Sequence, residues 1–317
     1  MYNLKTLKEK VSHTADQVEC PVRGCRHTAE RQKKHFVRDE KYLCPTHQIF
    51  LSPTTFEYSH YTSNLLSDAP EDLALLEKIL VKKRENRLAR SNSEDAVTWN
   101  SFRYLEKNNL LPGYLASIGV SGTDNAKIHY WCFDERTGGT NPLLLQAHKV
   151  FGERSSRGSE PDVLLETDGA LIIIECKTGS GNNTMPSRAS VEMCYTEADD
   201  KHYDTVFRSD FTSIAVGEKK YELLRFWLLG TWMAKQKGKR FYLINLVRDE
   251  KEREIESQFG KHIVQTAGTF KRATWEDMHR YIQESNCPNQ QPVLSYLQNQ
   301  TLGYSSSGRI RAAYKLG

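Results

Sequence analysis

Two acidic residues and a lysine are spaced so that they would meet at one end of a β-hairpin: Asp162, Glu175 and Lys177. The runs 163–166 and 170–176 are rich in Leu, Ile and Val and are typical of β-strands. The Asp-Gly dipeptide between these runs favours a two-residue turn. In that register Asp162 lies directly opposite Glu175, so both side chains share one face of the sheet. Lys177 points to the same face because it follows Glu175 by two residues.

This grouping of two carboxylates and one ammonium favours a divalent metal ion. Close carboxylates repel each other unless a cation lies between them, and oxygen ligands suit Mg²⁺ or Mn²⁺. A metal held by Asp162 and Glu175 would polarise a phosphoryl oxygen and activate a water, while Lys177 would stabilise developing negative charge. The run Leu171–Ile174 is continuously apolar, as in a strand buried on both faces. The charges that follow it would therefore lie at the mouth of a buried sheet. A register slip of one residue would instead place Asp162 on the opposite face.

The spacing of these residues resembles the signature of the PD-(D/E)XK nuclease superfamily. Pro161-Asp162 is followed after twelve residues by Glu175-Cys176-Lys177. The resemblance, which covers residues 93–250, implies a restriction-endonuclease-like α/β fold with a mixed central sheet flanked by helices. It also implies an Mg²⁺- or Mn²⁺-dependent nuclease that hydrolyses phosphodiester bonds, with DNA favoured and RNA as the alternative. A bacterial or phage role such as restriction or defence would follow.

A fourth active-site residue, again an acid, is expected from a helix upstream of the hairpin. Ser93 is a good N-cap, and Glu94 and Asp95 follow it in the first helical turn. This stretch resembles the first helix of related bacterial nuclease-like proteins, which often supplies a further active-site acid. The resemblance implies Glu94 as a catalytic and metal-binding residue, with Asp95 as its competitor. The alternative is that an acid at this position only stabilises the helix dipole.

A second metal centre is predicted near the N-terminus. Cys20 and Cys25 form one pair, and Cys44 and His47 form another after a gap of eighteen residues. Four sulfur and nitrogen ligands suit a closed tetrahedral Zn²⁺ site, and soft thiolates argue against Mg²⁺. A module of this size with few large apolar residues needs such a staple. His27 or His35 are alternatives to His47 as the fourth ligand.

Basic and glycine-rich segments are candidates for contact with nucleic acid. The stretch 31–38 is basic and carries one aromatic residue, so it would either touch phosphates or form an ordinary solvated surface. Loops at Gly138-Gly139 and Arg157-Gly158 would follow a phosphate backbone. The single histidines His148 and His202 are expected in core or surface roles rather than in catalysis.

The remaining pattern predicts four parts: a zinc-binding module at 1–60, a connecting helix within 61–92, the nuclease-like domain at 93–285, and a tail at 286–317. Helices are expected at 71–90, at 93–108 with Leu111-Pro-Gly ending it, and at 218–236, 252–259 and 274–284. Strands are expected at 127–133 and 240–247. Helices and strands in this order suggest a mixed sheet flanked by helices.

Composition limits which classes of protein and which cellular locations are possible. The net charge of +4 and pI near 8.5 are compatible with nucleic acid without being diagnostic. No apolar run approaches the roughly 20 residues of a membrane span, and no secretory signal is evident. We therefore expect a cytoplasmic protein, in which the odd number of seven cysteines argues against a disulfide framework.

The alternative to an enzyme is a non-catalytic, zinc-containing protein that binds nucleic acid or acts as a scaffold on a nuclease-like fold. The intact Asp162, Glu175 and Lys177 set argues against such loss of activity. Either class of protein would act as a homodimer, with a partner subunit, or alone.

Overall fold

The chain forms two compact units, each assembled from separate segments of sequence. The computed structural model describes residues 1–32, 36–52, 55–83, 86–153, 158–187, 191–199, 201–299, 302–304 and 310–312. The first unit comprises Met1–Asp72, Glu85–Tyr104 and Met278–Gly317, and the second comprises Leu73–Arg84 and Leu105–Asp277. The boundaries expected near positions 60, 92 and 285 stay predictions.

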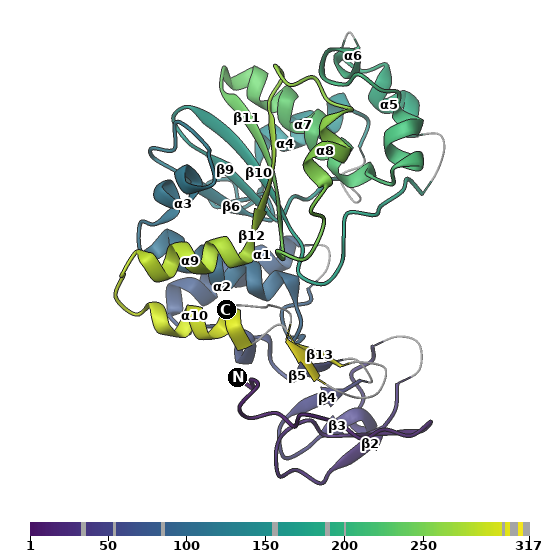
Figure 1. Cartoon of the computed structure of the whole chain (residues 1–317), viewed down its shortest axis with the longest axis vertical. Helices are drawn as coiled ribbons and strands as arrows, with labels where there is room; N and C mark the ends of the chain where they lie inside the picture. Colours follow the sequence, from purple (N-terminus) through teal and green to yellow (C-terminus); the bar gives the residue numbers. More distant parts are fainter. Residues whose placement is uncertain are drawn as a thin grey trace. The chain divides into compact units, whose positions relative to one another are not determined.

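The second unit is built on a five-stranded mixed sheet (Figure 1). Its strands lie in the order β12 (Thr269–Thr274), β11 (Arg240–Val247), β10 (Ala170–Cys176), β9 (Val163–Glu166) and β6 (Lys127–Tyr130). Strands β10, β11 and β12 run parallel, whereas β9 is antiparallel to both β10 and β6. The expected α/β class with a mixed central sheet is therefore confirmed, as are the bounds of β9, β10 and β11.

Both faces of the central strand β10 are removed from water. Helices α4 (Pro142–Val150) and α7 (Tyr221–Lys237) pack on the face that carries Leu171 and Ile173. Helix α3 (Leu111–Ser117) lies on the other side of the sheet (Figure 1). Every residue of β10 is buried, as its continuous apolar run predicted.

The other elements of the second unit are short. They are β7 (Phe133–Asp134), β8 (Gly139–Thr140), α5 (Glu192–Thr196), α6 (His202–Val206), a π-helical turn at Ser213–Gly217, and α8 (Ile255–Gly260). Among the described residues, no helix combines the length and apolar character that crossing a membrane requires.

The first unit combines small sheets with helices. Strands β1 (Gln17–Glu19) and β2 (Thr28–Glu30) pair with each other, and β3 (Leu43–Cys44), β4 (Ile49–Leu51) and β5 (Phe56–Tyr58) form an antiparallel sheet. The unit also holds 3-10 turns at Glu40–Tyr42 and Tyr61–Asn64, helix α10 (Gln290–Asn299), and the paired strands β13 (Leu302–Tyr304) and β14 (Ile310–Ala312). Three helices cross the boundary between the units along the chain: α1 (Pro70–Lys82), α2 (Glu94–Lys107) and α9 (Trp275–Glu284).

Local signals explain the start of α2 and one of two errors in the expected helices, and a tertiary contact explains the other error. Ser93 caps α2 as expected, because its Oγ accepts a hydrogen bond of 3.1 Å from the Ala96 N–H. The helix expected over 71–90 ends instead at Lys82, since Ala89 lies alongside β5, where its carbonyl accepts from the Tyr58 N–H. The sequence Leu111-Pro-Gly was expected to end a helix, but it begins α3, because proline is well tolerated in a first helical turn. The tail also contains a helix, α10, that its polar composition did not predict. Its basic end from Arg309 lies mostly outside the described residues.

Packing of α7 on the sheet depends on a glycine. A Cβ atom added at Gly230 would overlap the ring of Phe241 in β11. We expect Gly230→Ala to lower the free energy of unfolding by about 1–3 kcal/mol, because overpacking outweighs the better helix propensity of alanine. Urea titration followed by circular dichroism measures the change. Gly139→Ala, where the added Cβ meets nothing within 4 Å, should be close to neutral. Equal stability of the two variants would contradict this account.

Candidate functional site

The β9–β10 hairpin has the register predicted from its turn. Val163 pairs with Ile174, and the two-residue turn is closed by the Thr167 N–H, which donates to the Ala170 carbonyl at 2.9 Å. Extending this register by one pair would set Asp162 opposite Glu175. The charge of Asp162 acts on Glu175, so the two acids lie close together at the same end of the hairpin.

Asp162 is fixed at the hairpin end through both its side chain and its backbone. Its Oδ2 accepts a hydrogen bond of 2.8 Å from the Cys176 N–H, and its carbonyl accepts one of 2.9 Å from the Trp131 N–H. Trp131 and Cys132 both have left-handed backbones, with φ of 45° and 60°. Such conformations are uncommon away from glycine, and they let the chain turn beside Asp162 directly after β6.

Glu175 and Lys177 form a close, largely buried ion pair. Lys177 Nζ lies 2.5 Å from Glu175 Oε1, and their side chains are 15% and 5% exposed. Burial raises the pKa of Glu175 well above its usual range, and the neighbouring charge of Asp162 adds to this, although Lys177 opposes it. Burial alone would lower the pKa of Lys177, but Glu175, Glu222 and Asp162 more than offset it and raise the pKa of the ammonium. Lys177 is therefore held in its charged form.

A third carboxylate, which the sequence analysis did not identify, also reaches Lys177. Glu222 in the first turn of α7 places Oε2 3.2 Å from Lys177 Nζ. Local sequence gave no signal for this contact, since Glu222 lies 45 positions from Lys177 in the numbering. The group therefore holds three carboxylates and one ammonium, with a net charge of −2 when all four are ionised.

A buried polar network lies beside the site on the next strand. Asn245 in β11 is the register partner of Glu175. Its Nδ2 donates to Glu252 at 2.8 Å, and its Oδ1 accepts from Asn182 at 2.8 Å. Asn182 also donates to Glu252 through its backbone N–H and its side chain. Because Asn182 and Asn245 are fully buried, this network fixes the loop that leaves β10 after Lys177.

The remaining predicted acid, Glu94, begins helix α2 in the first unit, whereas the hairpin lies in the second. Its assignment to the active site stays a prediction. Asp95, the alternative to Glu94, makes a hydrogen bond within the first unit: its Oδ2 accepts one of 3.3 Å from the Arg87 N–H.

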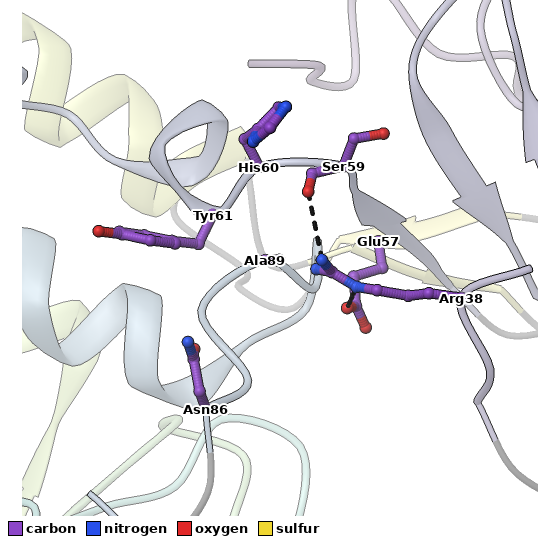
Figure 2. Close-up of a pocket in the computed structure, with 7 residues that line it drawn as sticks. All are labelled: Arg38, Glu57, Ser59, His60, Tyr61, Asn86 and Ala89. Carbon is purple, nitrogen blue, oxygen red and sulfur yellow. Dashed lines mark hydrogen bonds and ion pairs between the residues drawn. The ribbon is translucent and has the colours of Figure 1, made fainter. Parts of the chain in front are cut away.

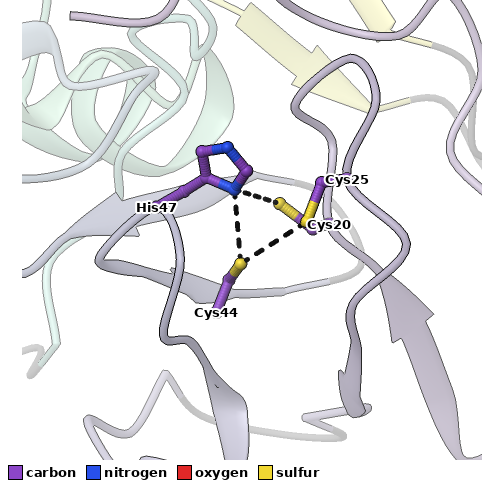
Figure 3. A group of neighbouring side chains, drawn as sticks. All are labelled: Cys20, Cys25, Cys44 and His47. Carbon is purple, nitrogen blue, oxygen red and sulfur yellow. Dashed lines mark hydrogen bonds between the residues drawn. The ribbon is translucent and has the colours of Figure 1, made fainter.

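The N-terminal cysteines and His47 converge in the first unit, as predicted (Figure 3). His47 Nδ1 lies 3.4 Å from Cys44 Sγ and 3.6 Å from Cys20 Sγ, and Cys25 Sγ lies 3.8 Å from Cys44 Sγ. Tetrahedral Zn²⁺ with bonds of about 2.3 Å to sulfur and about 2.0 Å to nitrogen would place its ligand atoms about 3.5–3.8 Å apart. The cluster therefore has the spacing that a structural zinc requires.

The surroundings of the cluster also suit a cation. Burial raises the pKa of the Cys20 and Cys44 thiols, so a bound metal is what would stabilise their thiolates. Burial, together with Lys8, lowers the pKa of His47 and favours the neutral imidazole that a metal needs. Lys8 also donates to the Cys25 carbonyl at 2.6 Å. This contact was not predicted from the sequence, and Lys8 also forms an ion pair with Glu19.

The structure describes one of the two histidines that were alternatives to His47 as a zinc ligand. His27 Nε2 lies 3.0 Å from the Leu43 carbonyl oxygen and is not a member of the cluster. His35 lies outside the described residues. Within the described residues, these four side chains are the only group of three or more Cys, His, Asp or Glu ligands that lie within 4.8 Å of one another.

The basic stretch 31–38 makes contacts inside the first unit at both ends; its residues 33–35 lie outside the described part. Arg31 donates to the Thr14 carbonyl, and Arg38 forms an ion pair of 2.7 Å with Glu57. Arg38 and Glu57 line a cavity of about 300 Å³ (Figure 2). The rings of His60 and Tyr61 extend away from the Arg38 guanidinium in this view, so the lining does not converge on one ligand. Contact of this stretch with nucleic acid stays a prediction.

A second buried ion pair in the second unit has a structural explanation. Glu153 accepts two hydrogen bonds of 2.9 Å from Arg225, and Ser159 and Tyr195 also donate to it. His148 lies beside this pair and His202 is buried near α7, so both are core residues as expected. A Cβ at Gly158 would meet the His148 ring at 2.6 Å, which accounts for that glycine by packing alone. Arg157 lies outside the described residues.

Comparison with known proteins identifies no family. No protein-family model matches the chain, and no curated protein or solved structure matches it. The site geometry is therefore the basis for any functional assignment.

The cluster geometry predicts about one tightly bound zinc per chain. We expect Cys44→Ser to lose this metal and to make residues 1–60 sensitive to protease, because the small core around Cys20 and Cys44 would lose its staple. Elemental analysis and limited proteolysis measure both effects. Cys194→Ser, which alters an exposed cysteine outside the cluster, should retain the zinc. Full zinc content in Cys44→Ser would contradict the assignment.

Proposed function

We propose that this protein is a metal-dependent nuclease that hydrolyses phosphodiester bonds, with DNA as the favoured substrate. The observation that carries the proposal is the convergence of Asp162, Glu175 and Lys177 at one end of the β9–β10 hairpin. The mixed sheet that positions them agrees with the restriction-endonuclease-like fold implied by the sequence resemblance.

The charge of the site supports binding of a divalent cation. Asp162 and Glu175 offer oxygen ligands, and the group with Lys177 and Glu222 carries two excess negative charges when ionised. Mg²⁺ is commonly bound by one or two protein carboxylates, with water and substrate phosphates completing its shell. The pair Asp162 and Glu175 therefore fits Mg²⁺ or Mn²⁺, and a bound ion would polarise the phosphate and lower the pKa of a coordinated water.

The protein groups have distinct tasks in this proposal. Asp162 and Glu175 hold the cation. The Cys176 N–H fixes the Asp162 side chain, and the pairing of β10 with β11 fixes the backbone of Glu175. Lys177 remains charged and stabilises the negative charge that develops on the phosphate. The zinc cluster stabilises the first unit, and we propose nucleic-acid contact for that unit rather than chemistry.

Substitution of the hairpin residues tests the proposal. We expect wild-type protein with Mg²⁺ or Mn²⁺ to cleave plasmid DNA, and Glu175→Ala and Lys177→Ala to lose at least about a hundredfold in rate, because each removes a group that stabilises the transition state. Agarose gels with DNA and RNA substrates, with and without metal, measure cleavage.

The matched control is Glu166→Gln, which neutralises an acid at the opposite end of the same hairpin and should retain activity. If wild type does not cut, or if the hairpin variants cut equally well, the catalytic proposal is wrong. Nucleic-acid binding without metal-dependent cleavage would indicate the non-catalytic alternative.

The raised pKa of Glu175 predicts a pH-dependent metal affinity. The protonated carboxyl must lose its proton before it can bind a cation, so Mg²⁺ affinity should rise with pH up to the raised pKa and level off above it. At mildly acidic pH, metal binding should release protons. Calorimetric titration in two buffers with different ionisation enthalpies measures this release, and Glu175→Gln should abolish it. Binding of equal strength at acidic and neutral pH would contradict the assignment of Glu175 as a ligand.

A further inference from the structure

The Lys177 ammonium has two carboxylate partners, and only one of them belongs to the hairpin. Glu175 Oε1 lies 2.5 Å from Lys177 Nζ. Glu222 Oε2, which belongs to helix α7, lies 3.2 Å from the same nitrogen. The side chain of Glu222 is 29% exposed, compared with 5% for Glu175. The Glu222 oxygen that contacts Lys177, Oε2, is nevertheless buried.

The backbone of Glu222 is held in place by the loop that follows the hairpin. Its N–H donates to Thr184 Oγ1 at 2.8 Å, and the Thr184 N–H donates to the Lys219 carbonyl at 2.7 Å. Leu223 and Leu224, which follow in α7, are fully buried in the core of the second unit. The first turn of α7 is thus anchored on both sides, which fixes the backbone that carries Glu222.

The nearby lysine of the same turn has other partners. Lys220 Nζ donates to Asn183 Oδ1 at 3.1 Å and lies 3.7 Å from Glu252 Oε1. The two charged residues of this turn therefore serve different networks: Lys220 joins the buried amide network, and Glu222 joins the hairpin site.

We propose that Glu222 is a positioning residue that holds the Lys177 ammonium in place when Asp162 and Glu175 bind a divalent cation. The inference rests on the metal-dependent hydrolysis proposed above. A cation on Glu175 neutralises much of the charge that attracts Lys177, and it repels the ammonium directly. Glu222 is not one of the proposed metal ligands, so it becomes the principal partner of Lys177.

The flexibility of lysine explains why a second partner matters. Its ammonium is a point charge on a four-carbon stem, and fixing that stem costs side-chain entropy. Without Glu222, the cation would drive the ammonium away from the position in which it stabilises the reacting phosphate. Glu222 thus acts through Lys177 and needs no contact with the substrate or the metal.

Nuclear magnetic resonance of the full chain with ¹⁵N-labelled lysine tests the inference without relying on activity. The Lys177 ammonium signal is assigned by its loss in Lys177→Gln. Addition of Mg²⁺ should shift this signal in wild type and leave it sharp, because Glu222 retains the ammonium. In Glu222→Gln, the same addition should broaden the signal beyond detection. Glu218→Gln is the matched control, because it neutralises a partly exposed glutamate that pairs with Lys261 instead of Lys177.

Kinetics provide a second measurement. Glu222→Gln should lower kcat for DNA cleavage on the order of tenfold with little change in KM, and it should cause no further loss in a Lys177→Gln background. If Mg²⁺ does not move the wild-type signal, no cation reaches the hairpin, and the proposed function fails together with this inference. If the wild-type signal moves and Glu222→Gln keeps an equally sharp signal, only the positioning role is overturned.

Discussion

The antiparallel pairing of β9 with β10 is the constraint on which the candidate site depends. Side chains alternate between the two faces of a strand, so a shift of one residue between these strands would send Asp162 and Glu175 to opposite faces. The pairing of Val163 with Ile174 prevents this, because both strands are buried and their apolar residues fill the two sides of the sheet. The core thereby fixes the positions of charges that contribute little to it.

The parts of the fold that the sequence predicted correctly are those governed by near neighbours. The hairpin register follows from the Asp-Gly turn, strand β11 from its apolar run, and the start of α2 from the Ser93 cap. Glu222 and Asn245 were missed because they reach the site through packing of α7 and through strand order, and single-sequence patterns encode neither. The helix expected over 71–90 was too long because its last part pairs with β5, a tertiary contact that overrides helix propensity.

The first unit is stabilised in a different way from the second. The apolar core around the cysteines is small, and Cys20 and Cys44 are themselves among its buried members. Four ligands from two separated turns lie close together, so a metal bound there would link these two turns. The types and spacing of the cysteines and His47 predicted this cluster. The contact of Lys8 with the Cys25 carbonyl was not predicted, because it depends on tertiary packing.

The first unit is discontinuous, and this affects the order in which the protein can fold. Its helix α10 contributes buried Val293, Leu294, Tyr296 and Leu297, yet these residues follow the whole of the second unit in the chain. During synthesis, the second unit has all of its residues before the first unit has its own. The usual sequence, in which the N-terminal domain folds first on the ribosome, would therefore be reversed. The contacts of α10 with the N-terminal segment can form only after the whole of the second unit has been synthesised.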